Sequence, residues 1–190
     1  MAKFLPHVAR SFITLGKRES RLYQLEKKGS KVVMLCVRAF PRHAVWTDFS
    51  MSEVERTLVF TSVYSSRVMV WNLLSEEHTI LARNETHSTS VVSRYGSVAF
   101  IATSRSSLLG VNLLTMDTLT WSSLEAPVSH MFFNHDESQL FALCGMNLYV
   151  FKHCDQRGVP YQAYPRVFHM SILGGQPYHI TNLLPDSNRT

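Results

Sequence analysis

Residues 58–62, which read LVFTS, decide the fold, because this stretch returns twice along the chain at intervals of forty residues. The copies are residues 98–102, VAFIA, and residues 138–142, SQLFA, and they align without a gap. The same interval relates three further sets of positions: Met51, Val91 and Met131; Val68, Leu108 and Leu148; Trp71, Val111 and Phe151. Three copies with one spacing indicate an internal repeat.

Each copy has the pattern of a β meander. Short segments rich in β-branched and aromatic residues alternate with polar turns, which is typical of antiparallel strands. Uninterrupted apolar runs, such as residues 58–60 and 98–101, predict strands that are covered on both faces. The predicted strands cover residues 45–51, 57–63, 67–74 and 79–82; 88–93, 98–103, 108–114 and 119–121; and 128–133, 140–144 and 147–154.

A period of forty residues with four strands is typical of one blade of a β-propeller. Residues 68–73, VMVWNL, resemble the end of the third strand in a blade of the WD-repeat family, with Asn72 where that family usually has aspartate. Residues 110–113 and 149–152 keep the position but lack the tryptophan, and no Gly-His pair precedes the first strands. Packing is therefore expected to hold these blades together, in place of the family's buried hydrogen-bond network. The resemblance spans residues 44–158.

The resemblance implies an all-β fold: one incomplete propeller over residues 1–190, with three to four WD-like, four-stranded antiparallel blades. The expected blades cover residues 4–43, 44–85, 86–126 and 127–160, followed by C-terminal strands in 161–190. In the first, degenerate blade, residues 11–15 and 21–25 match the second and third strands, and residues 26–31 form a long hairpin tip. The expected markers of the blade cores are Tyr23, Trp71, Val111 and Phe151.

The end faces of such a stack are expected to bind other proteins. Closed propellers have four to eight blades, and this chain supplies fewer than five. The apolar faces at the two ends would stay uncovered, and a bare apolar face of that size is a site of association. Residues 165–173 and 177–184 are candidates for the start of one further blade.

Positive charge is concentrated near the N-terminus. Residues 1–42 hold ten of the nineteen basic side chains and only two acids, which gives this segment a net charge of +8. The rest of the chain is net negative, so the whole chain has a net charge of +5. This segment suits an acidic partner, either RNA or an acidic protein surface. The alternative is a solvated hairpin whose lysines only maintain solubility. The candidate contact residues are Lys17, Arg18, Arg21, Lys27, Lys28 and Lys31.

No motif indicates an enzyme. The chain has no GxSxG, HxH or HExxH motif, and Gly174-Gly175 lacks the lysine and hydroxyl residue of a phosphate-binding loop. His130, His135 and His153, with Cys144 and Cys154, do not have metal-site spacing. We expect no catalytic residue, no metal, no cofactor and no small-molecule substrate.

The cysteines, the N-terminal residues and the apolar runs indicate the expected cellular compartment. Cys36, Cys144 and Cys154 are odd in number and lack CxxC spacing, which favours reduced thiols in an intracellular compartment, the nucleus, nucleolus or cytoplasm. Residues 1–18 have four basic residues and no acid, like a mitochondrial presequence, but Pro6 interrupts the pattern. No apolar run approaches the roughly 18 to 20 residues of a membrane span.

Two functions remain open, and both follow from the expected architecture. The first is a non-catalytic scaffold for protein–protein interactions in a larger complex. The second comes from residues 128–133, 141–143 and 149–151, which resemble the late blades of cirhin-type propellers of the small-subunit processome. That resemblance implies a nucleolar role in ribosome biogenesis, in contact with pre-rRNA or assembly factors. A propeller hydrolase or lyase is disfavoured, because acids and histidines do not converge at matching blade positions.

Overall fold

The computed structural model describes residues 1–5, 8–82, 84–145, 147–152 and 166–169. These residues form sixteen strands and no helix, so the described chain contains no helix able to span a membrane. The strands make four antiparallel four-stranded sheets, each ordered as in the chain. The first sheet contains β1 (Ala2–Phe4), β2 (Ser11–Leu15), β3 (Ser20–Lys28) and β4 (Lys31–Ala39); the second, β5 (Asp48–Met51), β6 (Thr57–Thr61), β7 (Arg67–Asn72) and β8 (His78–Ala82). The third contains β9 (His87–Val92), β10 (Val98–Thr103), β11 (Ser107–Asn112) and β12 (Thr118–Ser123); the fourth, β13 (Val128–Phe133), β14 (Gln139–Cys144), β15 (Asn147–Lys152) and β16 (Arg166–His169).

The all-β class and the antiparallel four-stranded units are confirmed. Strands β2, β10 and β13 begin and end where the sequence predicted them. Strand β5 begins at Asp48 and not at Val45. Before it, the Ser62 hydroxyl donates a hydrogen bond to the Val45 carbonyl at 2.6 Å, and the Thr47 N–H donates to the Thr61 carbonyl at 2.9 Å.

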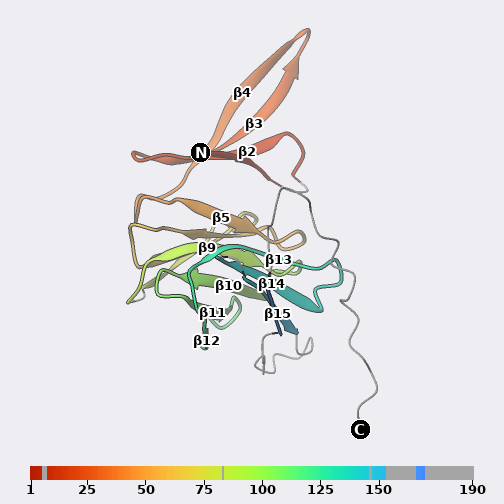
Figure 1. Ribbon diagram of the computed structural model, residues 1–190. Coiled ribbons are helices and arrows are strands. Elements are labelled where there is room, and N and C mark those ends of the chain that lie inside the picture. The colour runs from red at the N-terminus through yellow and green to blue at the C-terminus, as the bar shows by residue number, and fades with distance from the viewer. Residues whose placement is uncertain (6–7, 83, 146, 153–165, 170–190) are drawn as a thin grey trace.

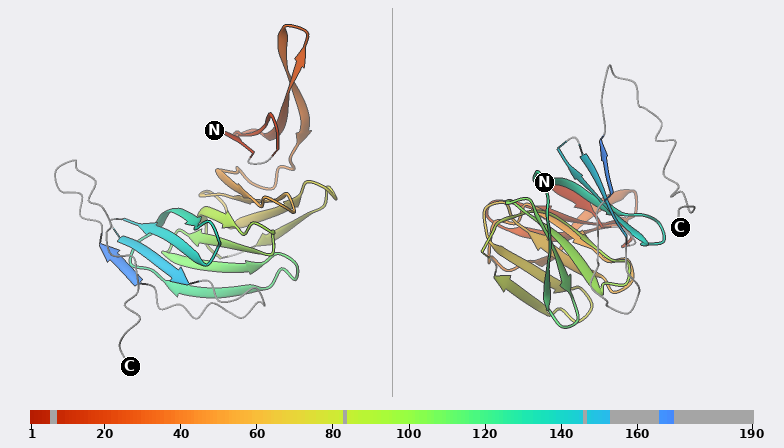
Figure 2. Two further views of the ribbon diagram at one scale, coloured as in Figure 1. Left: turned by 90° about the vertical axis from the view of Figure 1, so that its right-hand side faces the viewer. Right: turned by 60° about the horizontal axis from the view of Figure 1, so that its bottom comes forward.

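The four sheets follow one another in space in chain order (Figure 1). Strand β5 lies beside β9, and β9 lies beside β13, so the first strands of successive sheets are neighbours. The Lys3 ammonium donates to the Phe49 carbonyl at 2.9 Å, which joins β1 to β5 in the same way. Two further views show the same succession of sheets (Figure 2).

Three hydrophobic clusters fill the three interfaces between sheets. Between the first and second sheets lie Ile13, Leu15, Phe40, Phe49, Phe60 and Trp71. Between the second and third lie Val59, Val70, Ala99, Ile101 and Val111. Between the third and fourth lie Phe100, Leu108, Leu140, Tyr149 and Phe151.

Consecutive residues of a central strand therefore point into different interfaces. Phe60 packs towards the first sheet and Val59 towards the third, and both are completely buried. Side chains alternate between the faces of a strand, so a strand between two sheets needs apolar residues at every position. The prediction that the uninterrupted apolar runs are covered on both faces is confirmed.

The gapless alignment at forty residues is wrong for the second strands. Leu58 pairs with Trp71, Ala99 with Val111, and Leu140 with Phe151. The structure thus matches Leu58 with Ala99 and Leu140, and not with Val98 and Ser138. The separation between the paired residues falls from 13 to 12 to 11 positions, because the connection between second and third strands shortens by one residue in each sheet.

The first strands show the same shift. Met51 pairs with Leu58, Val92 with Ala99, and Phe133 with Leu140, so the matched set is Met51, Val92 and Phe133. The predicted matches Val91 and Met131 are each wrong. The one-residue correction from Val91 to Val92 changes the face of the sheet, and so the interface, whereas the two-residue correction from Met131 to Phe133 keeps the same face.

The C-terminal boundary at residue 160 is also wrong. Strand β16, expected among separate strands in 161–190, pairs with β15, with Tyr149 opposite Val167. It is the fourth strand of the fourth sheet, because β15 would otherwise leave its backbone groups unpaired along that edge. The apolar run at 177–184 lies outside the described residues.

Candidate interaction surfaces

Three of the predicted core markers lie at matching positions of the third strands. Trp71, Val111 and Phe151 each face the preceding sheet and are 5%, 1% and 0% exposed. The Trp71 ring stacks on His78 at 4.9 Å and meets Phe40 edge-on at 5.3 Å. No described group accepts a hydrogen bond from its buried indole N–H.

The fourth marker, Tyr23, occupies the corresponding position in the first sheet but is only half-buried. Tyr23 pairs with Phe12 as Trp71 pairs with Leu58. Their face of the sheet is covered by no other described sheet, whereas Ile13, on the opposite face of β2, is completely buried.

Three aromatic rings lie along this uncovered face. Phe12 stacks on Tyr23 at 5.4 Å with an interplanar angle of 19°, and Phe4 lies 5.6 Å from Phe12. Phe4 is 66% exposed. We call Phe4, Phe12 and Tyr23 the outer aromatic face.

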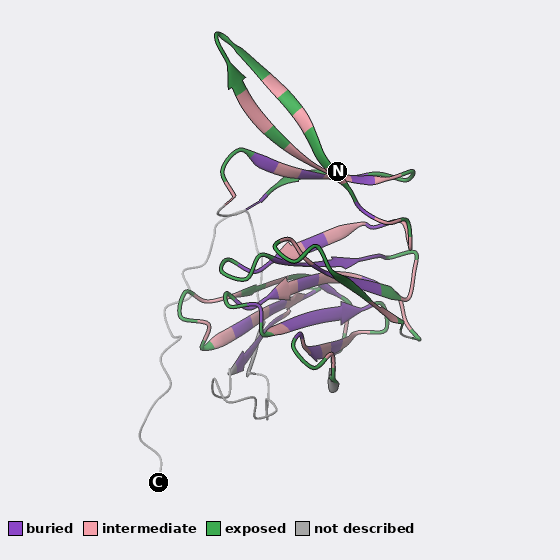
Figure 3. Ribbon diagram, turned by 180° about the vertical axis from the view of Figure 1, so that it is seen from behind, coloured by how far each residue is buried: buried purple, intermediate pink, exposed green. Residues whose placement is uncertain are grey.

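A long hairpin extends from the first sheet. Strands β3 and β4 have nine residues each and are joined by Gly29 and Ser30. Gly29 has φ +64°, which fits the first central position of a type II′ turn. We call residues 20–39 the arm. It projects away from the stacked sheets in Figure 1 and is coloured exposed or intermediate over most of its length in Figure 3.

The arm separates the predicted basic residues into two groups. Lys27, Lys28 and Lys31 are exposed at its tip, whereas Lys17 and Arg18 lie in the turn before β3. At about 3.3 Å per residue, the length of β3 places the groups roughly 25 Å apart. The six predicted contact residues therefore do not form one patch.

Arg21, the sixth predicted contact residue, lies near the base of the arm. It forms an ion pair with Glu19 at 2.7 Å. The hydrogen bond that the Arg21 guanidinium donates to the Glu19 carboxylate raises the pKa of Arg21 above its usual value. Its positive charge is therefore partly compensated within the same turn.

The basal basic residues line a hollow of about 360 Å³ next to the second sheet. Lys17 and Arg18, from the turn before β3, line it together with Arg42 and His43, from the connection after β4. Arg42 and His43 were not among the predicted contact residues. The only signal was their place directly after the arm.

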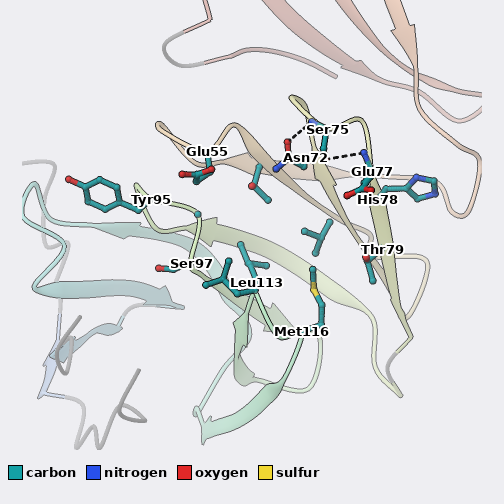
Figure 4. A pocket seen from close by; sticks show the side chains of 14 residues that line it. Glu55, Asn72, Ser75, Glu77, His78, Thr79, Tyr95, Ser97, Leu113 and Met116 are labelled. Atoms are coloured by element: carbon teal, nitrogen blue, oxygen red, sulfur yellow. Dashed lines mark hydrogen bonds between the residues drawn. The ribbon is translucent and has the colours of Figure 1, made fainter. Parts of the chain in front are cut away.

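A second hollow of about 370 Å³ lies between the second and third sheets (Figure 4). Its polar residues hold turns. The Asn72 side-chain oxygen accepts hydrogen bonds from the N–H groups of Leu74 and Ser75, at 2.8 and 3.1 Å. Asn112 repeats this arrangement in the next sheet.

A third hollow of about 480 Å³ lies across β5, β9 and β13, and one ion pair and one backbone hydrogen bond of Arg94 connect the turns of three sheets there. The Arg94 guanidinium lies 3.0 Å from the Glu53 carboxylate, and the Arg94 N–H donates to the Glu137 carboxylate. These residues come from the turns that follow the first strands. Sequence reasoning missed them, because charged residues are common in polar turns and nothing in the sequence pairs these three.

The remaining candidates for chemistry are dispersed. His130 and His135 are exposed, and His153 and Cys154 lie outside the described residues. Within the described ranges, no three His, Cys, Asp or Glu side chains are grouped to hold a metal ion. Cys36 is an exposed thiol, and burial raises the pKa of the Cys144 thiol to about 11.

Comparison with known proteins adds no family to this description: no protein-family model matches the chain, and no curated protein matches it.

Proposed function

We propose that this chain is a non-catalytic, WD-like β-propeller scaffold that mediates protein–protein interactions within a larger complex. Its four sheets would be the blades of an incomplete propeller. The neighbouring first strands, the packing of each inner sheet against two others, and the repeated positions of Trp71, Val111 and Phe151 support this proposal.

The outer aromatic face is the observation that carries the proposal. Phe12 and Tyr23 occupy the positions of Leu58 and Trp71, which are 0% and 5% exposed because another sheet covers them. Full burial of one large apolar side chain contributes about 1.5–3 kcal/mol. A partner that covers this face would therefore gain the same kind of contact that joins the sheets to one another.

The native mass of the purified chain tests this role. We expect light scattering to give a mass above the 21.7 kDa of one chain, because the outer aromatic face self-associates when its partner is absent. Phe4→Glu should return the mass to 21.7 kDa. Leu114→Glu is the matched control, since Leu114 is 82% exposed on a different surface. A wild-type monomer that binds no hydrophobic dye would contradict the proposal.

The second candidate is a ribosome-biogenesis factor of the small-subunit processome that contacts pre-rRNA or assembly factors. It is favoured by Lys27, Lys28 and Lys31, none of which forms an ion pair with another described residue. If these lysines contact phosphates, their triple change to glutamate should lower the salt dependence of RNA binding, log Kd against log salt, by about 2. The control is Lys17→Glu/Arg18→Glu, at the other end of β3. An unchanged slope in the triple variant excludes RNA contact by the tip.

A further inference from the structure

Strand β4 is the longest of the four strands that lie fourth in their sheets, and its outer edge is free of any other described strand. Among the described strands, β4 pairs only with β3, and it has nine residues where the corresponding strands β8 and β12 have five and six. Proteins usually protect such edges with short strands, charges or proline. Between Lys31 and Arg38, β4 has six consecutive uncharged residues, VVMLCV.

The hairpin geometry shows which backbone groups along this edge are open. Lys28 and Lys31 close the turn as a hydrogen-bonded pair, and hydrogen-bonded and open pairs alternate along an antiparallel ladder. Lys31, Val33 and Leu35 therefore direct their N–H and C=O groups towards β3. Val32 and Met34 direct theirs outward, into solvent.

The same two residues also have exposed side chains. Val32 and Met34 are 68% and 57% exposed, whereas Val33 is half-buried. Their side chains share a face with Cys36, the cross-strand partner of Tyr23. Open hydrogen-bonding groups and an apolar stripe thus coincide, and the stripe continues the outer aromatic face.

The charge around the free edge of β4 indicates which kind of strand can bind there. Lys27, Lys28 and Lys31 surround the tip, with Glu26 as the only acid of the arm. A second copy of β4 would bring no acidic side chain to these lysines, because residues 31–39 contain no acid, whereas opposite charges across a strand pair stabilise a sheet. A second copy is therefore disfavoured, and a strand with acidic residues is favoured.

We propose that β4 binds an extended segment of a partner protein by antiparallel strand addition. The segment carries apolar residues at alternate positions and acidic residues at its C-terminal end. β4 runs from the tip to the base of the arm, so an antiparallel segment runs from base to tip and brings its C-terminal end to the three lysines. This assignment rests on the proposed scaffold role and names the chemistry of its partner.

A synthetic peptide tests the assignment. Its first six residues alternate valine and threonine, and four glutamates follow. We expect saturable binding in a fluorescence anisotropy titration, together with slower hydrogen exchange at the amides of Val32 and Met34. Met34→Pro removes one outward N–H without removing a bond to β3, and proline is tolerated at such edge positions. It should weaken binding at least tenfold, whereas Met34→Ala, which keeps the N–H, should weaken it about twofold to threefold.

Reversing the charge of the tip lysines tests the orientation of the bound peptide, and binding of an oppositely charged peptide shows that the variant is folded. Lys27→Glu/Lys28→Glu/Lys31→Glu should lose binding to this peptide and bind a peptide that ends in four lysines. Equal binding by Met34→Pro and wild type, or no protection of β4, would overturn the proposal. Tight binding of a twelve-nucleotide oligouridylate with no binding of the peptide would assign the edge to RNA instead. If the peptide does not bind, the native mass of the chain and its change in Phe4→Glu are still expected as above. The light-scattering experiment therefore tests the scaffold role separately from strand addition at β4.

Discussion

Replacement of Trp71 tests whether packing, without a hydrogen bond from the indole, holds the second sheet against the first. The ring is 5% exposed and lies between the His78 ring at 4.9 Å and the Phe40 ring at 5.3 Å. The Arg38 guanidinium lies 5.7 Å from its centre. The indole N–H has no acceptor among the described residues.

Trp71→Ala and Trp71→Phe are expected to lower the free energy of unfolding by different amounts. Trp71→Ala removes a buried ring and leaves a cavity, which costs about 3–5 kcal/mol of the free energy of unfolding. Trp71→Phe keeps an aromatic ring against His78 and loses no hydrogen bond, so we expect about 1–2 kcal/mol from the removed atoms alone. If the N–H were bonded to a buried acceptor, leaving that acceptor unsatisfied would add about 1–3 kcal/mol.

Urea unfolding followed by circular dichroism measures both values. With a slope of about 2 kcal/mol/M, Trp71→Ala should lower the midpoint by about 2 M and Trp71→Phe by less than 1 M. Tyr64→Ala is the control, because Tyr64 is 75% exposed and should change the midpoint little. A Trp71→Phe variant as unstable as Trp71→Ala would refute a packing role and indicate a hydrogen-bonded tryptophan.

Three further predictions concern single positions. Burial raises the pKa of Cys144 from 9.0 to about 11. Above pH 9 the unfolded chain therefore loses this proton before the folded chain does, and the free energy of unfolding should fall between pH 9 and 11. At pH 8, a thiol reagent should modify the exposed Cys36 but should not modify the buried Cys144 until urea is added. Gly96→Ala should cost about 1–2 kcal/mol in urea unfolding, since φ is +71° and the new Cβ would lie 3.0 Å from Glu55. Asn72→Ala should cost about 1–2 kcal/mol through two lost turn hydrogen bonds, and Asn72→Asp, which keeps an acceptor, should cost less.

The repeat predicted the strands well because each inner strand must be apolar on both faces. Residues 98–103 and 128–133 were predicted to the residue. The register of the strands was harder to predict, because the connection between the second and third strands loses one residue in each successive sheet. A fixed interval of forty therefore matches Trp71, Val111 and Phe151 but places the preceding strands one or two residues out of register.

The surfaces were less predictable than the strands. The basic residues were visible in the sequence, but their division between the tip and the base of the arm depends on the length of β3. The uncovered position of Tyr23 depends on which face of the first sheet meets the second, a matter of tertiary packing. The link from Arg94 to Glu53 and Glu137 joins turns of three sheets, and no local pattern marks it.

Disulfide trapping between neighbouring sheets tests the stacking most directly. The hydroxyl oxygens of Ser50 in β5 and Ser90 in β9 lie 2.8 Å apart, close enough for a disulfide after both are changed to cysteine. In a variant whose natural cysteines are changed to serine, Ser50→Cys/Ser90→Cys should form an intramolecular disulfide on mild oxidation, detected as a loss of 2 Da. Ser50→Cys/Ser88→Cys should not, because the Ser88 hydroxyl donates instead to Val128 of the fourth sheet. Failure of the first pair to close, or equal closure of the second, would contradict the face-to-face stacking of successive sheets.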